Sequence, residues 1–182
     1  MSGKLIALGF SVALAACGST KMLPAPKDVP SVKLYEVLKD KDNSKMLRGI
    51  VFKEQITQDT AFKWYAQNVK LTKPDAAAVS AIAAKANDIQ LVIFGGTWCE
   101  DTHQILPKYL SLLEAAKFPD DHLTLVTVDR AKTTISHLEK VFNITNVPTC
   151  IVLKSGKEVG RIVEYGKTGL ADKELGEMVA AL

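Results

Sequence analysis

Cys99 is the residue whose chemistry follows most directly from its surroundings in the sequence. It lies after an apolar run at residues 89–93 and before a segment with helical periodicity. A cysteine at the start of a helix faces free backbone N–H groups and the positive end of the helix dipole, which both favour its thiolate. We therefore expect Cys99 to be a nucleophile that attacks disulfides; the alternative is a small residue left in a turn.

The residues after Cys99 modify this expectation. Glu100 and Asp101 are anions that would raise the pKa of a nearby thiol, although acids in a first helical turn also interact favourably with the helix dipole. Thr102 either completes the first turn or donates a hydrogen bond to the Cys99 sulfur. His103 lies four residues after Cys99, so the pair could begin a soft-metal site. Since no Cys/His cluster elsewhere completes a ligand set, we predict no metal.

A second thiol, Cys150, lies in an apolar run with Ile151 and Val152. Free cysteine in such a run behaves as a small hydrophobic side chain. Strand alternation predicts that Cys150 points into the core, and a Cys99–Cys150 disulfide is the alternative.

The elements that would position Cys99 form a regular series. The pattern predicts strands at 89–95, 123–129, 149–153 and 158–164, and helices at 99–117, 135–142 and 170–182. Residues 154–157 form a hairpin turn between the last two strands. The β-α-β-α-β-β-α order predicts an α/β fold with a four-stranded mixed sheet and flanking helices.

This order, with Thr-Trp-Cys at residues 97–99 and Val-Pro-Thr at 147–149, closely resembles the thioredoxin family over about residues 85–182. A proline inside the helix, here Pro107, also matches the family. The resemblance implies a thioredoxin-like three-layer sandwich and a cis Val147–Pro148 bond against Cys99.

The resemblance also implies how the site would work. Trp98 would flank the thiol as an apolar wall, and Val147 would help to form a groove that pairs with an extended peptide backbone. Asp129, at the end of the second strand, is placed to accept from the Trp98 indole N–H.

Two parts of the family's dithiol chemistry are missing. In the family's reductases a second cysteine stands three residues after the first, and a buried acid six residues before it; here these positions hold Thr102 and Ile93. Cys99 could still form a mixed disulfide, which an outside thiol would have to resolve. Cys99, Thr102 and Pro148 are thus the candidate catalytic residues.

The N-terminal residues show a pattern different from that of the rest of the chain. Residues 1–16 combine Lys4, a short apolar stretch and small residues, as a secretory signal does. Leu-Ala-Ala-Cys at 14–17 resembles the lipobox of bacterial lipoproteins, which implies a lipid on Cys17. A plain signal peptide cut near Ala16 and an uncleaved anchor are the alternatives. Gly18 after the cysteine favours the outer membrane, facing the periplasm.

We predict that the chain after the signal segment consists of a lipidated tether at 17–30, a mostly helical N-terminal extension at 31–88 and the thioredoxin-like domain at 89–182. The net charge of +3, without a basic run, gives no argument for a nucleic-acid partner.

Together these features predict a monomeric, membrane-tethered protein of the bacterial cell envelope that uses no cofactor. Cys99 would form mixed disulfides with envelope protein thiols or disulfides, or with small thiols. A non-catalytic peptide-binding module is the main alternative, and a copper or other metal carrier using Cys99 and His103 is another.

Overall fold

A computed structural model describes residues 33–182. The predicted signal segment, Cys17 and the tether lie outside the described residues. The strands are β1 (Tyr35–Lys39), β2 (Lys45–Val51), β3 (Ile89–Gly95), β4 (Leu123–Thr127), β5 (Thr149–Lys154) and β6 (Lys157–Val163). The α-helices are α1 (Glu54–Thr57), α2 (Lys63–Asn68), α3 (Ala76–Lys85), α4 (Glu100–Ala115), α5 (Leu138–Val141) and α6 (Ala171–Ala180). Four 3₁₀ turns join them: η1 (Thr60–Phe62), η2 (Val69–Leu71), η3 (Asp120–His122) and η4 (Ile135–His137).

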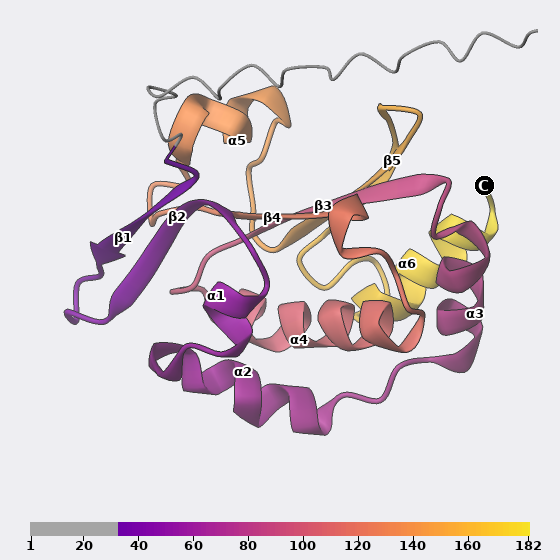
Figure 1. Ribbon diagram of the computed structural model, residues 1–182, viewed down its shortest axis with the longest axis horizontal. Coiled ribbons are helices and arrows are strands. Elements are labelled where there is room, and N and C mark those ends of the chain that lie inside the picture. The colour runs from indigo at the N-terminus through magenta and orange to yellow at the C-terminus, as the bar shows by residue number, and fades with distance from the viewer. Residues whose placement is uncertain (1–32) are drawn as a thin grey trace, which may run out of the picture. The chain divides into compact units, whose positions relative to one another are not determined.

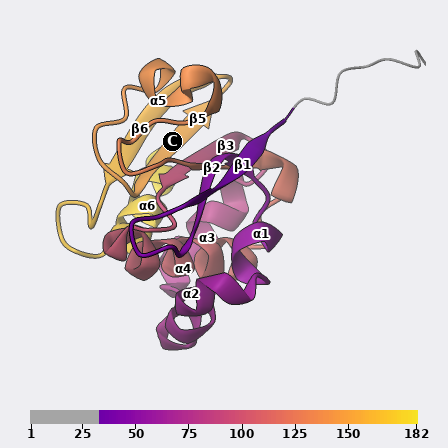
Figure 2. The same cartoon turned by 90° about the vertical axis from the view of Figure 1, so that its left-hand side faces the viewer.

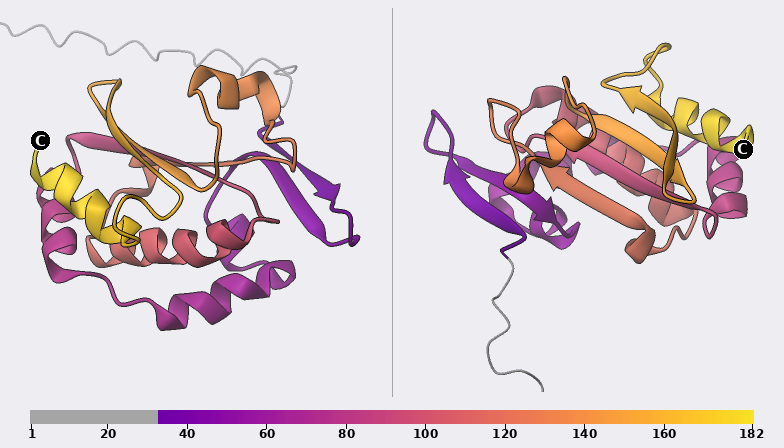
Figure 3. Two further views of the ribbon diagram at one scale, coloured as in Figure 1. Left: turned by 180° about the vertical axis from the view of Figure 1, so that it is seen from behind. Right: turned by 90° about the horizontal axis from the view of Figure 1, so that it is seen from above.

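One mixed sheet runs through the described part of the chain in the order β1-β2-β4-β3-β5-β6. Strands β3 and β4 pair in parallel, and every other neighbouring pair is antiparallel. The view from above in Figure 3 shows the sheet with the β1–β2 hairpin along one edge. The four strands predicted in residues 89–182 are confirmed, and the expected α/β class is correct.

The sheet has six strands rather than four, because the extension is not mostly helical at its start. Residues 35–51 form a hairpin whose second strand adds to β4 through Gly49–Val51. Its turn is the polar break at residues 40–44. The hairpin contributes Leu47 and Val51 to the core, so its sequence is apolar enough to be held by the sheet.

The helices lie in layers on the two faces of the sheet (Figures 1 and 2). Helices α3, α4 and α6 pack on one face, and α2 lies outside α4. The opposite face carries α5, where Phe94 of β3 contacts Phe142 with ring centroids 5.5 Å apart. The predicted three-layer arrangement is therefore present.

Strand β3 lies at the centre of the sheet and ends at the candidate site. All its residues except Gln90 are buried, so both faces of the strand are covered and the run is continuously apolar. Its end at Gly95 leads within five residues to Glu100, the first residue of α4. This junction fixes where Cys99 lies.

Candidate active site around Cys99

Cys99 is the residue just before α4, and its side chain is half-buried. Its backbone N–H donates to the Gly96 carbonyl at 2.9 Å, and its carbonyl accepts from the His103 N–H at 3.0 Å. A tight turn and the first helical hydrogen bond thus hold the residue. The sulfur lies beside the first turn of a 16-residue helix, where the helix dipole favours negative charge.

The Val147–Pro148 peptide bond is cis, as predicted. Val147 is buried, and its carbonyl oxygen lies 3.4 Å from the Cys99 sulfur, within reach of an S–H donor. The Pro148 carbonyl accepts from Glu164 N at 2.7 Å, which ties this loop to the end of β6. The loop therefore reaches the thiol with main-chain atoms.

Thr102 is buried behind Cys99 and turned toward the strand. Its hydroxyl oxygen accepts a hydrogen bond from Gly96 N at 3.1 Å, whereas Cys99 Sγ has Val147 O as its partner. Of the two roles considered for Thr102, a hydrogen bond to the Cys99 sulfur is therefore not formed among the described residues. Ile93, at the position of the family's buried acid, is 1% exposed in the apolar core.

Trp98 flanks Cys99, but the partner expected for its indole was wrong. Trp98 Nε1 donates to the Val128 carbonyl at 2.9 Å instead of to Asp129. The Asp129 carboxylate accepts from Thr133 and pairs with Arg48 of β2 at 3.0 Å. Burial would raise the pKa of Asp129, but these hydrogen bonds and the ion pair outweigh it and hold the pKa below its usual range. Asp129 therefore links the loop after β4 to strand β2.

Arg130 is a site residue that the sequence reasoning missed. Its guanidinium carbon lies 5.0 Å from the centre of the Trp98 ring, and its Nε and Nη2 pair with the two oxygens of Asp40. This ion pair lowers the pKa of Asp40. The hairpin turn thus contributes to the surroundings of Cys99 through Arg130.

Tyr165, from the loop after β6, was also missed. Its hydroxyl donates to Asp101 Oδ1 at 2.8 Å, and this hydrogen bond raises the pKa of Tyr165, with a smaller contribution from the negative charge that Cys99 can carry. Asp101, which the sequence left without a partner, therefore holds a half-exposed aromatic ring across the start of α4.

His103 contacts Thr97 and Trp64 rather than Cys99. Its Nε2 lies 2.9 Å from the Thr97 carbonyl, and its ring stacks on Trp64 of α2 at 4.3 Å. Within residues 33–182, no three His, Cys, Asp or Glu side chains gather closely enough to hold a metal ion. The geometry gives the metal-carrier alternative no support.

The same region explains how α4 accommodates Pro107. Proline has no N–H to donate to the carbonyl four residues earlier, which belongs to His103. The Asn68 side-chain amide of α2 donates to that carbonyl at 2.8 Å. Helix α2 thus satisfies the carbonyl that Pro107 cannot.

Cys150 lies in the core, as predicted. It is fully buried among apolar side chains, and burial raises the pKa of Cys150 to about 12. Both described cysteines are free, so the alternative Cys99–Cys150 disulfide is not formed.

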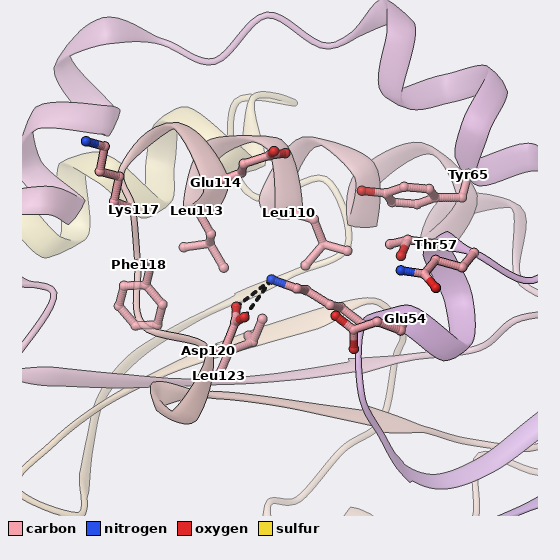
Figure 4. Close-up of a pocket in the computed structure, with 12 residues that line it drawn as sticks. Glu54, Thr57, Tyr65, Leu110, Leu113, Glu114, Lys117, Phe118, Asp120 and Leu123 are labelled. Atoms are coloured by element: carbon pink, nitrogen blue, oxygen red, sulfur yellow. Dashed lines mark hydrogen bonds and ion pairs between the residues drawn. The ribbon is translucent and has the colours of Figure 1, made fainter.

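A pocket of about 500 Å³ lies near the other end of α4 (Figure 4). Leu110 and Leu113 of α4 and the nearby Phe118 line it, and Lys53, which also lines it, pairs with Asp120 at 2.6 Å. Cys99 and its neighbours do not line this pocket.

Comparison with known proteins agrees with this geometry. The model of the thioredoxin family matches residues 70–173, more than half of the chain. The chain belongs to the thioredoxin family. Thioredoxin H2 of Arabidopsis thaliana is 32% identical over 89 residues, covering 49% of this chain and 62% of that protein. Thioredoxin H2-2 of Oryza sativa subsp. japonica is 30% identical over 93 residues, covering 50% and 65%. The chain therefore spans less than two thirds of each of these thioredoxins.

Solved thioredoxin structures are similar as well. Thioredoxin O2 from Arabidopsis thaliana in its oxidized state is 24% identical, with a TM-score of 0.39 over 61% of this chain and 91% of that one. The thioredoxin pre-protein of Schistosoma mansoni is 26% identical, with a TM-score of 0.38 over 60% and 94%. Among the helices of residues 33–182, none combines the length and apolar character needed to cross a bilayer.

Proposed function

We propose that this thioredoxin-family protein acts through a single thiol, by forming mixed disulfides at Cys99. The observation that supports this most is the placement of Cys99: half-exposed at the start of α4, beside the Val147 carbonyl. An accessible thiol at a helix N-terminus is the arrangement that favours a reactive thiolate.

The reaction is thiol–disulfide exchange. The Cys99 thiol loses its proton to solvent, and the thiolate attacks one sulfur of a substrate disulfide. A new bond forms between Cys99 and that sulfur, while the old S–S bond breaks and its electron pair leaves with the other thiolate. The substrates are disulfides of envelope proteins or of small thiols.

Among residues 33–182, no group placed near Cys99 can perform the second half of the dithiol reaction. Thr102 cannot attack a mixed disulfide, and Ile93 has no proton to transfer. Cys150 is fully buried and therefore a poor resolving thiol. We expect the mixed disulfide to persist until a thiol from solution releases it.

We also propose that the protein is tethered in the bacterial cell envelope through lipid on Cys17. Support comes from the Leu-Ala-Ala-Cys sequence after a short apolar segment. Gly18 supports the outer membrane, facing the periplasm.

Adduct trapping tests the mixed-disulfide proposal. Full-length protein with Cys17→Ser as the background, kept with glutathione disulfide and analysed by intact mass, should gain one glutathionyl group. The Cys99→Ser variant should gain none, whereas Cys150→Ala should gain one as the wild type does. Non-reducing gels of envelope extracts should show adducts that depend on Cys99 and disappear with dithiothreitol.

A different result points to the peptide-binding alternative. If the wild type and Cys99→Ser retain the same envelope proteins without a covalent adduct, binding in the groove beside Trp98 replaces thiol chemistry as the function.

A further inference from the structure

The ion pair between Asp40 and Arg130 joins segments that are 90 residues apart. Arg130 Nε donates to Asp40 Oδ1 at 2.5 Å, and Nη2 donates to Oδ2 at 2.7 Å. The Asp40 side chain is only 4% exposed, whereas that of Arg130 is 44% exposed. A two-pronged arginine–carboxylate pair fixes the plane of the guanidinium as well as its position. Arg130 is therefore an exposed cation with a defined orientation.

The orientation is fixed a second time by Trp98. The guanidinium carbon lies 5.0 Å from the ring centre, a cation–π distance. The ring itself is held by its hydrogen bond to Val128, and Gly96 leaves room for it, since a Cβ there would come within 2.8 Å of the indole. Trp98 and Cys99 pack against the same cluster, and Arg130 is close enough to Cys99 for their charges to interact, so the cation is held at one flank of the thiol.

Arg130 keeps hydrogen-bonding capacity for a ligand. A guanidinium has five N–H donors, and the pair with Asp40 uses two of them. Within residues 33–182, Nη1 makes no hydrogen bond to the protein. This nitrogen carries two N–H groups, which can donate hydrogen bonds to the oxygens of a carboxylate.

The other charges near Cys99 divide the site into two sides. Glu100 and Asp101 lie in the first turn of α4, and Asp101 is joined to Tyr165. Asp42, in the hairpin turn, attracts Arg130 through its charge, and its carboxylate accepts a hydrogen bond from the Ser44 hydroxyl. The Trp98 side thus presents the free Nη1 donors of Arg130, with Asp40 and Asp42 as its nearby carboxylates, whereas the Tyr165 side presents Asp101, with which no arginine or lysine of residues 33–182 pairs.

From this arrangement we infer that Arg130 is a specificity residue that selects disulfides with a carboxylate close to the attacked sulfur. The inference rests on the proposed mixed-disulfide chemistry at Cys99 and names its substrate class. A carboxylate on the Trp98 side would accept from Arg130 while Cys99 attacks the adjacent sulfur. Asp40 is the positioning residue, because it holds Arg130 in place.

Two small disulfides of different charge test this directly. The dianion 5,5′-dithiobis(2-nitrobenzoate) carries a carboxylate on each ring, and 4,4′-dithiodipyridine is neutral; both report release of a thiol by absorbance. The full chain with Cys17→Ser serves as the background, Cys99→Ser gives the blank rate, and peptide mass assigns the adduct to Cys99. The quantity compared is the ratio of the dianion rate to the neutral rate.

The Arg130→Ala variant should lower this ratio roughly threefold or more at low salt, because one favourable charge interaction across a few ångströms of water is lost. Arg130→Lys should keep part of the preference, because it keeps the positive charge but not the two-pronged pair with Asp40. Raising the salt concentration to about 0.5 M should reduce the wild-type preference, since exposed charges are then screened.

Arg161→Ala is the matched control. It removes the same charge from another arginine–carboxylate pair, the partly buried pair with Glu158, together with a hydrogen bond to the Phe142 carbonyl, and should leave the ratio unchanged. The neutral rate checks folding in each variant, and Arg130→Gln replaces Arg130→Ala if that rate collapses. If the ratio of dianion to neutral rate in Arg130→Ala equals that of the wild type and of Arg161→Ala, the inference about Arg130 is wrong, while the mixed-disulfide proposal stands. A Cys99 that reacts with neither probe overturns the mixed-disulfide proposal as well.

Discussion

At the scale of the residue, Thr102 shows that the place of a second thiol is filled rather than vacant. Its hydroxyl accepts from Gly96 N, and its methyl group lies where a Cβ on Gly95 would come within 2.9 Å. Strand β3 and helix α4 are therefore joined tightly at this point. The residue that cannot resolve a disulfide is also one that holds the site together.

The Thr102→Cys variant should restore the resolving step, because a thiol would then lie in the first turn with Cys99. We expect adducts to be released at least about tenfold faster and insulin reduction to rise, at a stability cost of about 1 kcal/mol for the lost hydrogen bond. Intact mass follows adduct release, insulin turbidity follows reduction, and urea unfolding gives the stability cost. Thr102→Ser, which keeps the hydroxyl, is the control. A wild type that reduces insulin as fast as Thr102→Cys would contradict the monothiol proposal.

Single residues were predictable from sequence where a short motif carried them. Cys99, Trp98 and Pro148 stand in two such motifs, and the structure brings the motifs together. The Trp98 partner was wrong because a main-chain carbonyl, at Val128, competed with the neighbouring Asp129 side chain. Arg130 was missed because its partner Asp40 is remote in the chain, and no local pattern reports such a pair.

At the scale of the element, the apolar runs of the sheet centre gave reliable predictions. Strand β3 was predicted at 89–95 and has those bounds, because both faces of a central strand are buried. The β1–β2 hairpin gave a mixed signal, since β1 is an edge strand with partly exposed residues on both faces. Only its pairing with β4, a non-local contact, makes the hairpin evident.

Helices α3 and α6 pack so closely that one methyl group should separate them. A Cβ on Gly176 would come within 2.3 Å of Ala78 Cβ and 2.4 Å of its Cα. Overpacking of this kind costs roughly 1–3 kcal/mol, so Gly176→Ala should lower the free energy of unfolding by about that amount. Urea denaturation measures it.

Two further variants make the test specific. Ala78→Gly in the Gly176→Ala background should recover part of the loss, and Glu177→Ala, at the exposed neighbouring position, should have little effect. An unchanged unfolding free energy in Gly176→Ala would show that the helices move apart without cost.

At the scale of the whole molecule, stability should fall in alkaline solution. Burial raises the pKa of Cys150 to about 12 and also raises that of Tyr109, while in the unfolded chain these groups ionise near about 8.5 and 10. The unfolded state therefore releases protons that the folded state retains. The stabilisation is complete below about pH 8.5 and is lost as the pH rises toward 12.

Between pH 8 and pH 10, the thiol alone should lower the free energy of unfolding by about 1–2 kcal/mol. Urea unfolding with reductant, at both pH values, gives this difference. Cys150→Ala should show a smaller drop than the wild type, because one ionising group is gone. Equal drops in the two proteins would show that Cys150 makes no contribution.

The proposed anchor is also a property of the whole chain. A Cys17→Ala variant should leave the membrane fraction and take up no radiolabelled palmitate, because the lipid attachment site is gone. Cys150→Ala should fractionate and label as the wild type does. Equal labelling of the wild type and Cys17→Ala would refute lipidation at Cys17.

Strand β2 has a consequence for solubility. The matched family region begins at residue 70, so a chain shortened to residues 70–182 would retain β3 to β6 and lose the hairpin. The edge of β4 that β2 covers would then present unpaired main-chain N–H and C=O groups, which are a template for aggregation. In the full chain that outer position belongs to β1, which carries Glu36 and Lys39. Light scattering should therefore find large aggregates for the shortened chain and far smaller particles for residues 33–182.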